Sequence, residues 1–241
     1  MKNSSTTPNT DLITQARKAL AGRWGLVIGI YVIWFAVVGW WNIVLPPEIF
    51  WDDLLLQVIT GPWALGLALV FLSVFRHQEA QVSEAFSGFA DFRKFCAGLA
   101  AYLLIMLLVH LWSLLLIIPG IMATCAYSMT FYVLADDPSM GPRQAISKSK
   151  ELMRGNKWKY FCLCFRFVGW YILLCGLPYG LALFGLSQYT DSSAHTINVV
   201  AGLAIWPGLL FVGPYFGVST SGFYDDLVNQ EEEESEPADE G

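Results

Sequence analysis

The chain has 241 residues, of which 55% are hydrophobic and 14% are charged, and its formal net charge is −6 at pH 7. Residues 95–135 include no Asp, Glu, Lys or Arg. Helices on the surface of a water-soluble protein need a polar stripe, so this composition excludes a soluble globular protein. A helix of about 20 apolar residues crosses the ~30 Å hydrocarbon core of a bilayer, and two such helices fit into this stretch.

Low-charge blocks on both sides of this stretch each divide at a polar turn. Residues 24–75 divide near Pro46 and Pro47, and residues 160–224 divide near Asp191. We therefore predict an all-α fold, a polytopic membrane helical bundle with six transmembrane helices arranged as three hairpins. The predicted spans are residues 25–45, 54–75, 95–112, 119–134, 161–183 and 197–216.

Short amphipathic segments precede the first and third hairpins. Apolar residues share one helical stripe in residues 12–20 and again in residues 145–153, so we predict a short cytoplasmic amphipathic helix at each place. The acidic end of the chain is typical of disorder. The predicted parts are a cytoplasmic N-terminal segment with an interfacial helix (1–23), a six-helix membrane domain (24–227) and a disordered acidic cytoplasmic tail (228–241).

The basic residues orient the predicted bundle. All Lys and Arg residues except Arg166 lie before the first helix or in the loops after the second and fourth helices. Arg166 lies near the same end of the fifth helix. Because Lys and Arg beside helix ends are retained in the cytoplasm, we predict that both termini are cytoplasmic.

Each cytoplasmic approach to a hairpin pairs cations with an aromatic residue. Lys and Arg near an anionic leaflet contribute ~1 kcal/mol each, and Trp prefers the headgroup layer. The alternative is that these cations only anchor the topology and recognise no particular lipid. The candidate headgroup-binding residues are Arg23, Trp24, Arg93, Lys94, Lys150, Arg154, Lys157, Trp158 and Lys159.

Proline and glycine interrupt the helices that return toward the cytoplasm. Proline lacks an N–H and either opens or kinks a helix. Broken helices are a feature of transporters, but Gly and Pro are also common in ordinary membrane helices. The candidate helix breaks are Pro62, Pro119, Gly120, Pro207 and Gly208. Three G-x-x-x-G patterns, in residues 25–29, 176–180 and 213–217, predict close helix packing within one chain, with a dimer interface as the alternative.

No catalytic constellation emerges from the sequence. His110 is the one ionisable group well inside an apolar span, and no embedded acid accompanies it. The chain has no H-E-x-x-H, P-loop or G-x-G-x-x-G motif, and its five cysteines have no C-x-x-C spacing. We therefore expect no enzyme, no catalytic residue, no metal site and no cofactor.

The most specific motifs lie between residues 112 and 170. They include the runs LIIPGI at 116–121, YVLADDP at 132–138 and GNKW at 155–158, and FYDDL follows at 223–227. With the glycine and proline at 61–62 and the segment 86–92, these motifs resemble the family called domain of unknown function 975. The resemblance implies a polytopic protein of the bacterial inner membrane, distantly similar to the membrane domains of some glycerophosphodiester phosphodiesterases. It implies no established reaction or substrate.

These observations lead to one expected function and one alternative. We expect a non-enzymatic polytopic inner-membrane protein that interacts with membrane lipids or with a protein partner. The acidic tail is a docking segment for a basic partner or for the protein's own basic loops, or simply a solubilising end. We expect no nucleic-acid partner, and the sequence leaves the oligomeric state open. The alternative is a small transporter or channel with proline- and glycine-interrupted helices.

Overall fold

The computed structural model describes residues 5, 7–44, 51–189 and 205–235, and all regular structure in these ranges is helical. The helices of the N-terminal half are α1 (Asn9–Leu20), α2 (Trp24–Val44), α3 (Trp51–Phe75), α4 (Val82–Ala85), α5 (Ser87–Ala90) and α6 (Phe92–Leu115). Those of the C-terminal half are α7 (Ile117–Tyr127), α8 (Thr130–Asp136), α9 (Pro142–Leu152), α10 (Lys157–Tyr171), the π-helix η1 (Ile172–Gly176), α11 (Leu177–Tyr189) and α13 (Trp206–Ser235).

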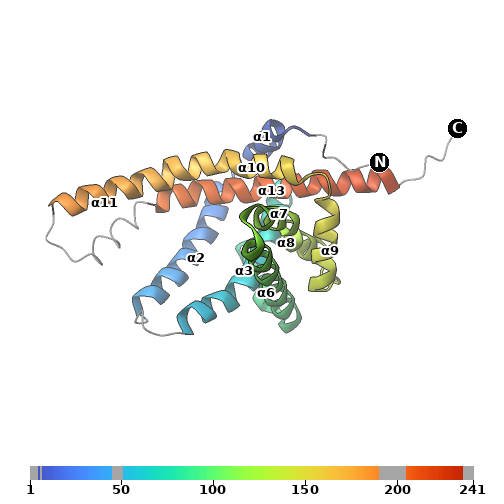
Figure 1. The fold of residues 1–241 in the computed structure, drawn as a ribbon, viewed down its shortest axis with the longest axis horizontal. Coiled ribbons are helices and arrows are strands. Elements are labelled where there is room, and N and C mark those ends of the chain that lie inside the picture. The colour runs from blue at the N-terminus through green and yellow to red at the C-terminus, as the bar shows by residue number, and fades with distance from the viewer. Residues whose placement is uncertain (1–4, 6, 45–50, 190–204, 236–241) are drawn as a thin grey trace.

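One long helical pair runs through the molecule. The elements α10, η1 and α11 follow one another without a break, and α10 and η1 lie beside α13 (Figure 1). The two members are antiparallel, because Tyr160 lies beside Phe223 whereas Phe167 lies beside Phe216. The helices α2, α3 and α6 extend away from this pair (Figure 1).

Four helical stretches are long and apolar enough to cross a membrane. They are Leu56–Phe75, Phe92–Leu115, Ile117–Asp136 and Lys157–Gly185. A fifth candidate joins α1 to residues 24–37 of α2, but these two helices are bent by 89° at their junction. The structure thus shows an all-helical chain with several apolar helices among the described residues, and it does not confirm six spans in three hairpins.

Two predicted segments differ from the helices observed. The expected span 119–134 is divided between α7 and α8, which are separated by a turn at Ser128 and Met129. Residues 228–235 were expected to be disordered, but they continue α13. Leu227 is buried there, and the Lys148 ammonium lies 2.6 Å from a Glu231 carboxylate oxygen, so this part of the acidic tail is fixed to α9. Residues 197–204 of the sixth predicted span and residues 236–241 lie outside the described ranges.

The predicted interfacial helix of the N-terminal segment packs on protein. In α1, Leu12, Ala16 and Leu20 are fully buried, and this helix lies against α13. The Tyr215 hydroxyl donates a hydrogen bond of 3.1 Å to the Ile13 carbonyl. Protein therefore covers the buried face of α1, since burial against protein removes the same apolar surface from water as burial in lipid.

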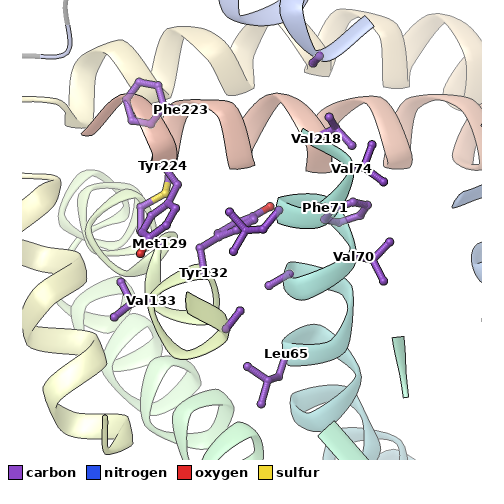
Figure 2. Close-up of a cluster of buried hydrophobic side chains, with 14 of the residues drawn as sticks. Leu65, Val70, Phe71, Val74, Met129, Tyr132, Val133, Val218, Phe223 and Tyr224 are labelled. Carbon is purple, nitrogen blue, oxygen red and sulfur yellow. The ribbon is translucent and has the colours of Figure 1, made fainter. Parts of the chain in front are cut away.

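The buried core joins α3, α8 and α13 (Figure 2). The Tyr132 hydroxyl donates to the Gly217 carbonyl at 3.0 Å, and the Ser221 hydroxyl donates to the Phe71 carbonyl at 3.1 Å. A Cβ on Gly217 would lie 2.3 Å from the Phe71 ring. This glycine therefore makes room for an aromatic ring of α3, a different use of G-x-x-x-G from the predicted close backbone approach.

The other two G-x-x-x-G patterns have no such partner. A Cβ on Gly25 or Gly29 in α2, or on Gly176 or Gly180 in η1 and α11, would meet no described atom within 4 Å. The prediction that these patterns pack helices within the chain is therefore wrong for the part of the chain that the structure describes. Spacing alone places two glycines on one helix face, but a partner must still reach that face.

Glycines also let α4 and α5 lie directly along the middle of α3. A Cβ on Gly66 would lie 2.0 Å from the Ala85 carbonyl oxygen, and one on Gly88 would lie 2.1 Å from the Pro62 carbonyl oxygen. Pro62 stands inside α3 and does not interrupt it, so it is not the break that the sequence predicted. Proline removes one N–H donor, and neighbouring structure makes this tolerable in an apolar helix.

A guanidinium clasp holds the ends of α3 and α8 against α13. Arg76, the first residue after α3, lies 2.5 Å from a carboxylate oxygen of Asp136 at the end of α8 and 2.7 Å from one of Asp225 in α13. The Tyr224 hydroxyl donates to Asp136 at 3.1 Å. The hydrogen bond with Asp136 and the pairing with Asp225 raise the pKa of Arg76 against the opposing effect of burial. The clasp is partly buried, and two guanidinium nitrogens face each carboxylate, an arrangement that suits arginine.

The contact between Gly66 and Ala85 predicts that Gly66→Ala destabilises the protein. The added methyl would overlap backbone, and overpacking costs about 1–3 kcal/mol, or roughly 5 °C in the unfolding midpoint. The matched control is Gly180→Ala, since that position meets no described atom and Gly→Ala normally favours a helix. Thermal unfolding in detergent measures both variants, and equal midpoints would contradict the packing at Gly66.

The clasp predicts that Arg76→Met lowers the unfolding midpoint, because two carboxylates then face each other without a cation. In that background, Asp136→Asn with Asp225→Asn should restore part of the loss, as expected for coupled neighbours. The control is Arg143→Met, which removes one exposed cation from the first turn of α9. The same midpoint for Arg76→Met and Arg143→Met would show that the clasp contributes nothing.

Candidate functional site

Three cations share one groove with an apolar floor. The groove has a volume of about 550 Å³ and lies between α6, α7, α9 and the start of α10. We call it the cationic groove, and its lining residues are Trp112, Pro119, Met122, Ala123, Ala126, Tyr127, Lys150, Arg154, Gly155 and Lys157.

The fold of α9 places these cations. The helix begins with Pro142, and the Gln144 side chain accepts a hydrogen bond of 2.9 Å from the Gly141 N–H. One face of α9 is apolar and buried, and the Ser149 hydroxyl donates to the Ala126 carbonyl of α7 at 2.9 Å. The helix ends before Gly155, whose φ of +94° belongs to the left-handed region that favours glycine. The chain then turns into α10, so Lys150, Arg154 and Lys157 reach the same side.

The groove is positively charged. Its lining contains no Asp or Glu among the described residues. The Lys150 ammonium lies 5.4 Å from the centre of the Tyr127 ring, a cation–π distance. Lys150 and Arg154 are exposed, and the ion pairs that Arg76 makes with Asp136 and Asp225, and Lys148 with Glu231, do not involve the three groove cations. The three cations are therefore available to an anion that reaches this surface.

A second groove adjoins the first and is almost entirely apolar. Its volume is about 410 Å³, and it shares Met122 and Lys157 with the cationic groove. Its other lining residues are Ile118, Ile121, Cys125, Trp158 and Phe161. The Lys157 ammonium group therefore lies at the border between the two grooves. We call the second groove the apolar groove.

Three of the predicted headgroup-binding residues make contacts within the protein. The Arg23 guanidinium donates to the carbonyls of Gln78 at 2.7 Å and His77 at 3.2 Å, just beyond α3. Trp24 stacks on Phe211 with ring centres 5.1 Å apart, and the Lys159 ammonium donates to the Ser5 carbonyl at 3.0 Å. The sequence gives no sign of these partners, because they come from distant parts of the chain.

The remaining candidates occupy two places. Arg93 and Lys94 line a separate cavity of about 500 Å³ together with Asp91, between α3, α6 and the loop after α8. Trp158 is 73% exposed and borders the apolar groove. The structure thus brings together Lys150, Arg154, Lys157 and Trp158, and it does not join Arg93 or Lys94 to them.

Apart from Pro62, which stands inside α3, the predicted helix breaks lie at helix starts. Pro119 and Gly120 belong to the first turn of α7, and Pro207 is the second residue of α13. Gly208 lies against η1, where a Cβ would be 2.5 Å from the Leu174 carbonyl oxygen. The irregular points inside long helices are the turn at 128–129 and η1 itself. Neither contains proline, and Gly176 of η1 was assigned to a G-x-x-x-G pattern, so a search for adjacent proline and glycine misses both.

His110 lies on the outer surface of the helices. Its side chain is exposed, and its Nδ1 lies 2.7 Å from the Met106 carbonyl oxygen of its own helix. Among the described residues, no group of three His, Cys, Asp or Glu side chains could hold a metal ion. The contact that the structure shows for the His110 ring is thus with the backbone of its own helix.

The model of one protein family, described as "Protein of unknown function (DUF975)", matches residues 114–231. No curated protein and no solved structure matches the chain. The matched region includes α7 to α11, most of α13, the three cations of the groove and both aspartates of the clasp, whereas Arg76 lies outside it. Residues 114–231, just under half of the chain, thus match the DUF975 family of proteins of unknown function.

Proposed function

We propose that this is a non-enzymatic membrane protein that binds an anionic phospholipid in the cationic groove. The observation that carries the proposal is the meeting of Lys150, Arg154 and Lys157 above an apolar floor that includes Trp112 and Met122. A phosphate group pairs well with Lys and Arg in charge-assisted hydrogen bonds. Each basic residue near an anionic membrane surface adds about 1 kcal/mol of attraction.

The adjoining apolar groove suits a lipid with two acyl chains. The two grooves lie on either side of Met122, and Lys157 borders both. A phosphate held at Lys157 would leave one apolar channel for each chain. Trp158, mostly exposed at the same border, is the kind of residue that sits at headgroup level.

We further propose that the protein lies in the bacterial cytoplasmic membrane with its cation-bearing face and both termini inside. The support is the asymmetric placement of Lys and Arg in the sequence. The acidic stretch fits an internal role, since Glu231 pairs with Lys148 of the protein's own basic segment. A distant relation to the membrane domains of glycerophosphodiester phosphodiesterases would also agree with contact to lipid.

The alternative of a transporter or channel needs polar groups that face a central path. In the described core, the buried hydroxyls of Thr130, Ser219 and Thr220 donate to carbonyls of nearby residues at 2.8–2.9 Å. Such internal bonds satisfy the hydroxyls without a solute. The geometry of these residues therefore favours lipid binding over transport.

Retention of phosphatidylglycerol tests the proposed site. The variant Lys150→Gln, Arg154→Gln, Lys157→Gln should bind this lipid at least tenfold more weakly, because it loses about 1 kcal/mol for each cation. The matched control replaces the exposed residues Arg17, Lys18 and Arg143 with Gln and changes the net charge equally. Native mass spectrometry of protein from mixed phosphatidylglycerol and phosphatidylcholine discs measures the bound lipid. Equal losses in both variants would contradict a specific groove.

A second variant tests the two-chain fit. Ile121→Trp should fill the apolar groove while it leaves the three cations in place. We expect weaker retention of phosphatidylglycerol but unchanged retention of its single-chain lyso form, measured in the same way. If both forms are lost together, or neither is, the apolar groove does not hold an acyl chain.

A further inference from the structure

The helical stretch Ile117–Asp136 meets the long helical pair near the same level at both of its ends. At the α8 end, Asp136 accepts a hydrogen bond from Tyr224 of α13. At the α7 end, Ile118 shares the apolar groove with Trp158 and Phe161 of α10. The first turn of α10 lies beside Phe223, because the Tyr160 and Phe223 ring centres are 5.5 Å apart.

The same stretch is too long to run along the pair between these contacts. Its 20 residues extend about 30 Å. Ile118 and Asp136 are about 27 Å apart along it, but their neighbours on the pair, Phe161 and Tyr224, lie near one level, because Tyr160 lies beside Phe223. Figure 1 agrees, since α10, α11 and α13 are drawn lengthwise while α7 and α8 are seen nearly end-on. The stretch Ile117–Asp136 therefore lies across the pair.

The charged helix α9 accompanies this stretch from one end to the other. It begins shortly after Asp136, its Ser149 is bonded to Ala126 near the middle, and Arg154 beyond its end shares a groove with Pro119. The exposed residues of this segment include Arg143, Lys150, Glu151 and Arg154. Charged side chains along the whole length are costly inside hydrocarbon. The stretch and α9 together belong at a membrane surface.

Helix α6, which is antiparallel to α7, carries an uncovered apolar stripe. Leu103, Leu107, Leu111 and Leu114 follow one another at helical spacing and are 46%, 65%, 54% and 87% exposed. Cations lie near both ends of α6, because Arg93 stands in its first turn and Trp112 lines the cationic groove. At the turn into α7, the Leu116 N–H donates to Trp112 and the Gly120 N–H donates to Leu116, so little backbone needs water.

We propose that the hairpin of α6, α7 and α8 does not cross the membrane but lies in one leaflet, on the cation-bearing face. The four-leucine stripe of α6 contacts the acyl chains of that leaflet, and the cations at the two ends of the hairpin contact its headgroups. This in-plane hairpin is an interaction surface for a single lipid monolayer. This in-plane placement follows from the arrangement of the helices and does not require a lipid bound in either groove.

The arrangement differs from the one that length and apolarity suggest. A crossing hairpin would place its tip on the opposite face, ~30 Å of hydrocarbon away from the cations. The observed tip instead contributes Trp112 and Pro119 to a groove with Lys150, Arg154 and Lys157. In a crossing hairpin, the leucine stripe would also pass through all depths of the bilayer.

Membrane depth along the stripe tests the proposal in the full-length protein. Single nitroxide labels replace Leu103, Leu107, Leu111 and Leu114 in a cysteine-free background, and the protein is placed in phosphatidylglycerol-containing vesicles. The ratio of oxygen to nickel-chelate accessibility reports the depth of each label. An in-plane helix predicts the same membrane depth at all four positions, whereas a crossing helix spreads them over about 16 Å.

Labels on a crossing helix of the same chain provide the matched control. Phe165, Ile172 and Leu181 are 68%, 63% and 63% exposed on the candidate span Lys157–Gly185, and their depths should differ from one another. A depth gradient along the leucine stripe, or nickel accessibility typical of water at all four positions, would overturn the proposal.

A cross-link provides an independent check of the tip. In the double variant Ser113→Cys, Arg154→Cys, a short bis-maleimide should join the two new thiols in native membranes. The reason is that Trp112, the residue before Ser113, shares a groove with Arg154. No cross-link, although both thiols react with a monofunctional maleimide, would contradict the position of the tip.

Discussion

The clasp of Arg76 with Asp136 and Asp225 is the constraint on which the arrangement depends. It joins the end of α3 to α8 and α13, and Tyr224, part of the buried core of these helices (Figure 2), donates a hydrogen bond to Asp136. With Asp136 held there, the stretch back to Ile117 has a fixed starting point. The hydrogen bond from Ser149 to Ala126 then fixes α9, and α9 brings its cations to the groove.

Burial divides the apolar helices into two kinds that composition does not distinguish. In the most apolar part of Leu56–Phe75, 56% of the residues are buried inside the protein. In Phe92–Leu115 this share is 11%, although the mean hydropathy of the two helices is nearly the same. An apolar side chain can leave water by burial in protein or by burial in lipid. The number of apolar residues therefore indicates that a helix avoids water, but it does not indicate which of the two environments surrounds the helix. For this reason the sequence predicted the existence of the helices α3, α6 and α10 well, but not the way they cross one another.

The site could be predicted only in part for a similar reason. Lys150, Arg154 and Lys157 are close in sequence, so a helix end and a turn bring them together almost inevitably. The apolar floor from Trp112 and Met122 depends on packing between helices, which local spacing does not determine. The clasp was missed, although the acidic runs YVLADDP and FYDDL were noticed, because nothing local pairs them with an arginine 60 residues or more away.

The central claim is that an uncharged stretch long enough for two crossings instead lies across the helical pair at its cation-bearing end. A cryo-electron microscopy map of the protein in a lipid nanodisc, with a bound antibody fragment to add mass, tests it most directly. The account predicts density for Trp112 and Ile118 on the same face of the disc as Lys150, with α10 and α11 passing through the disc. Density for the tip of the hairpin on the opposite face would contradict it.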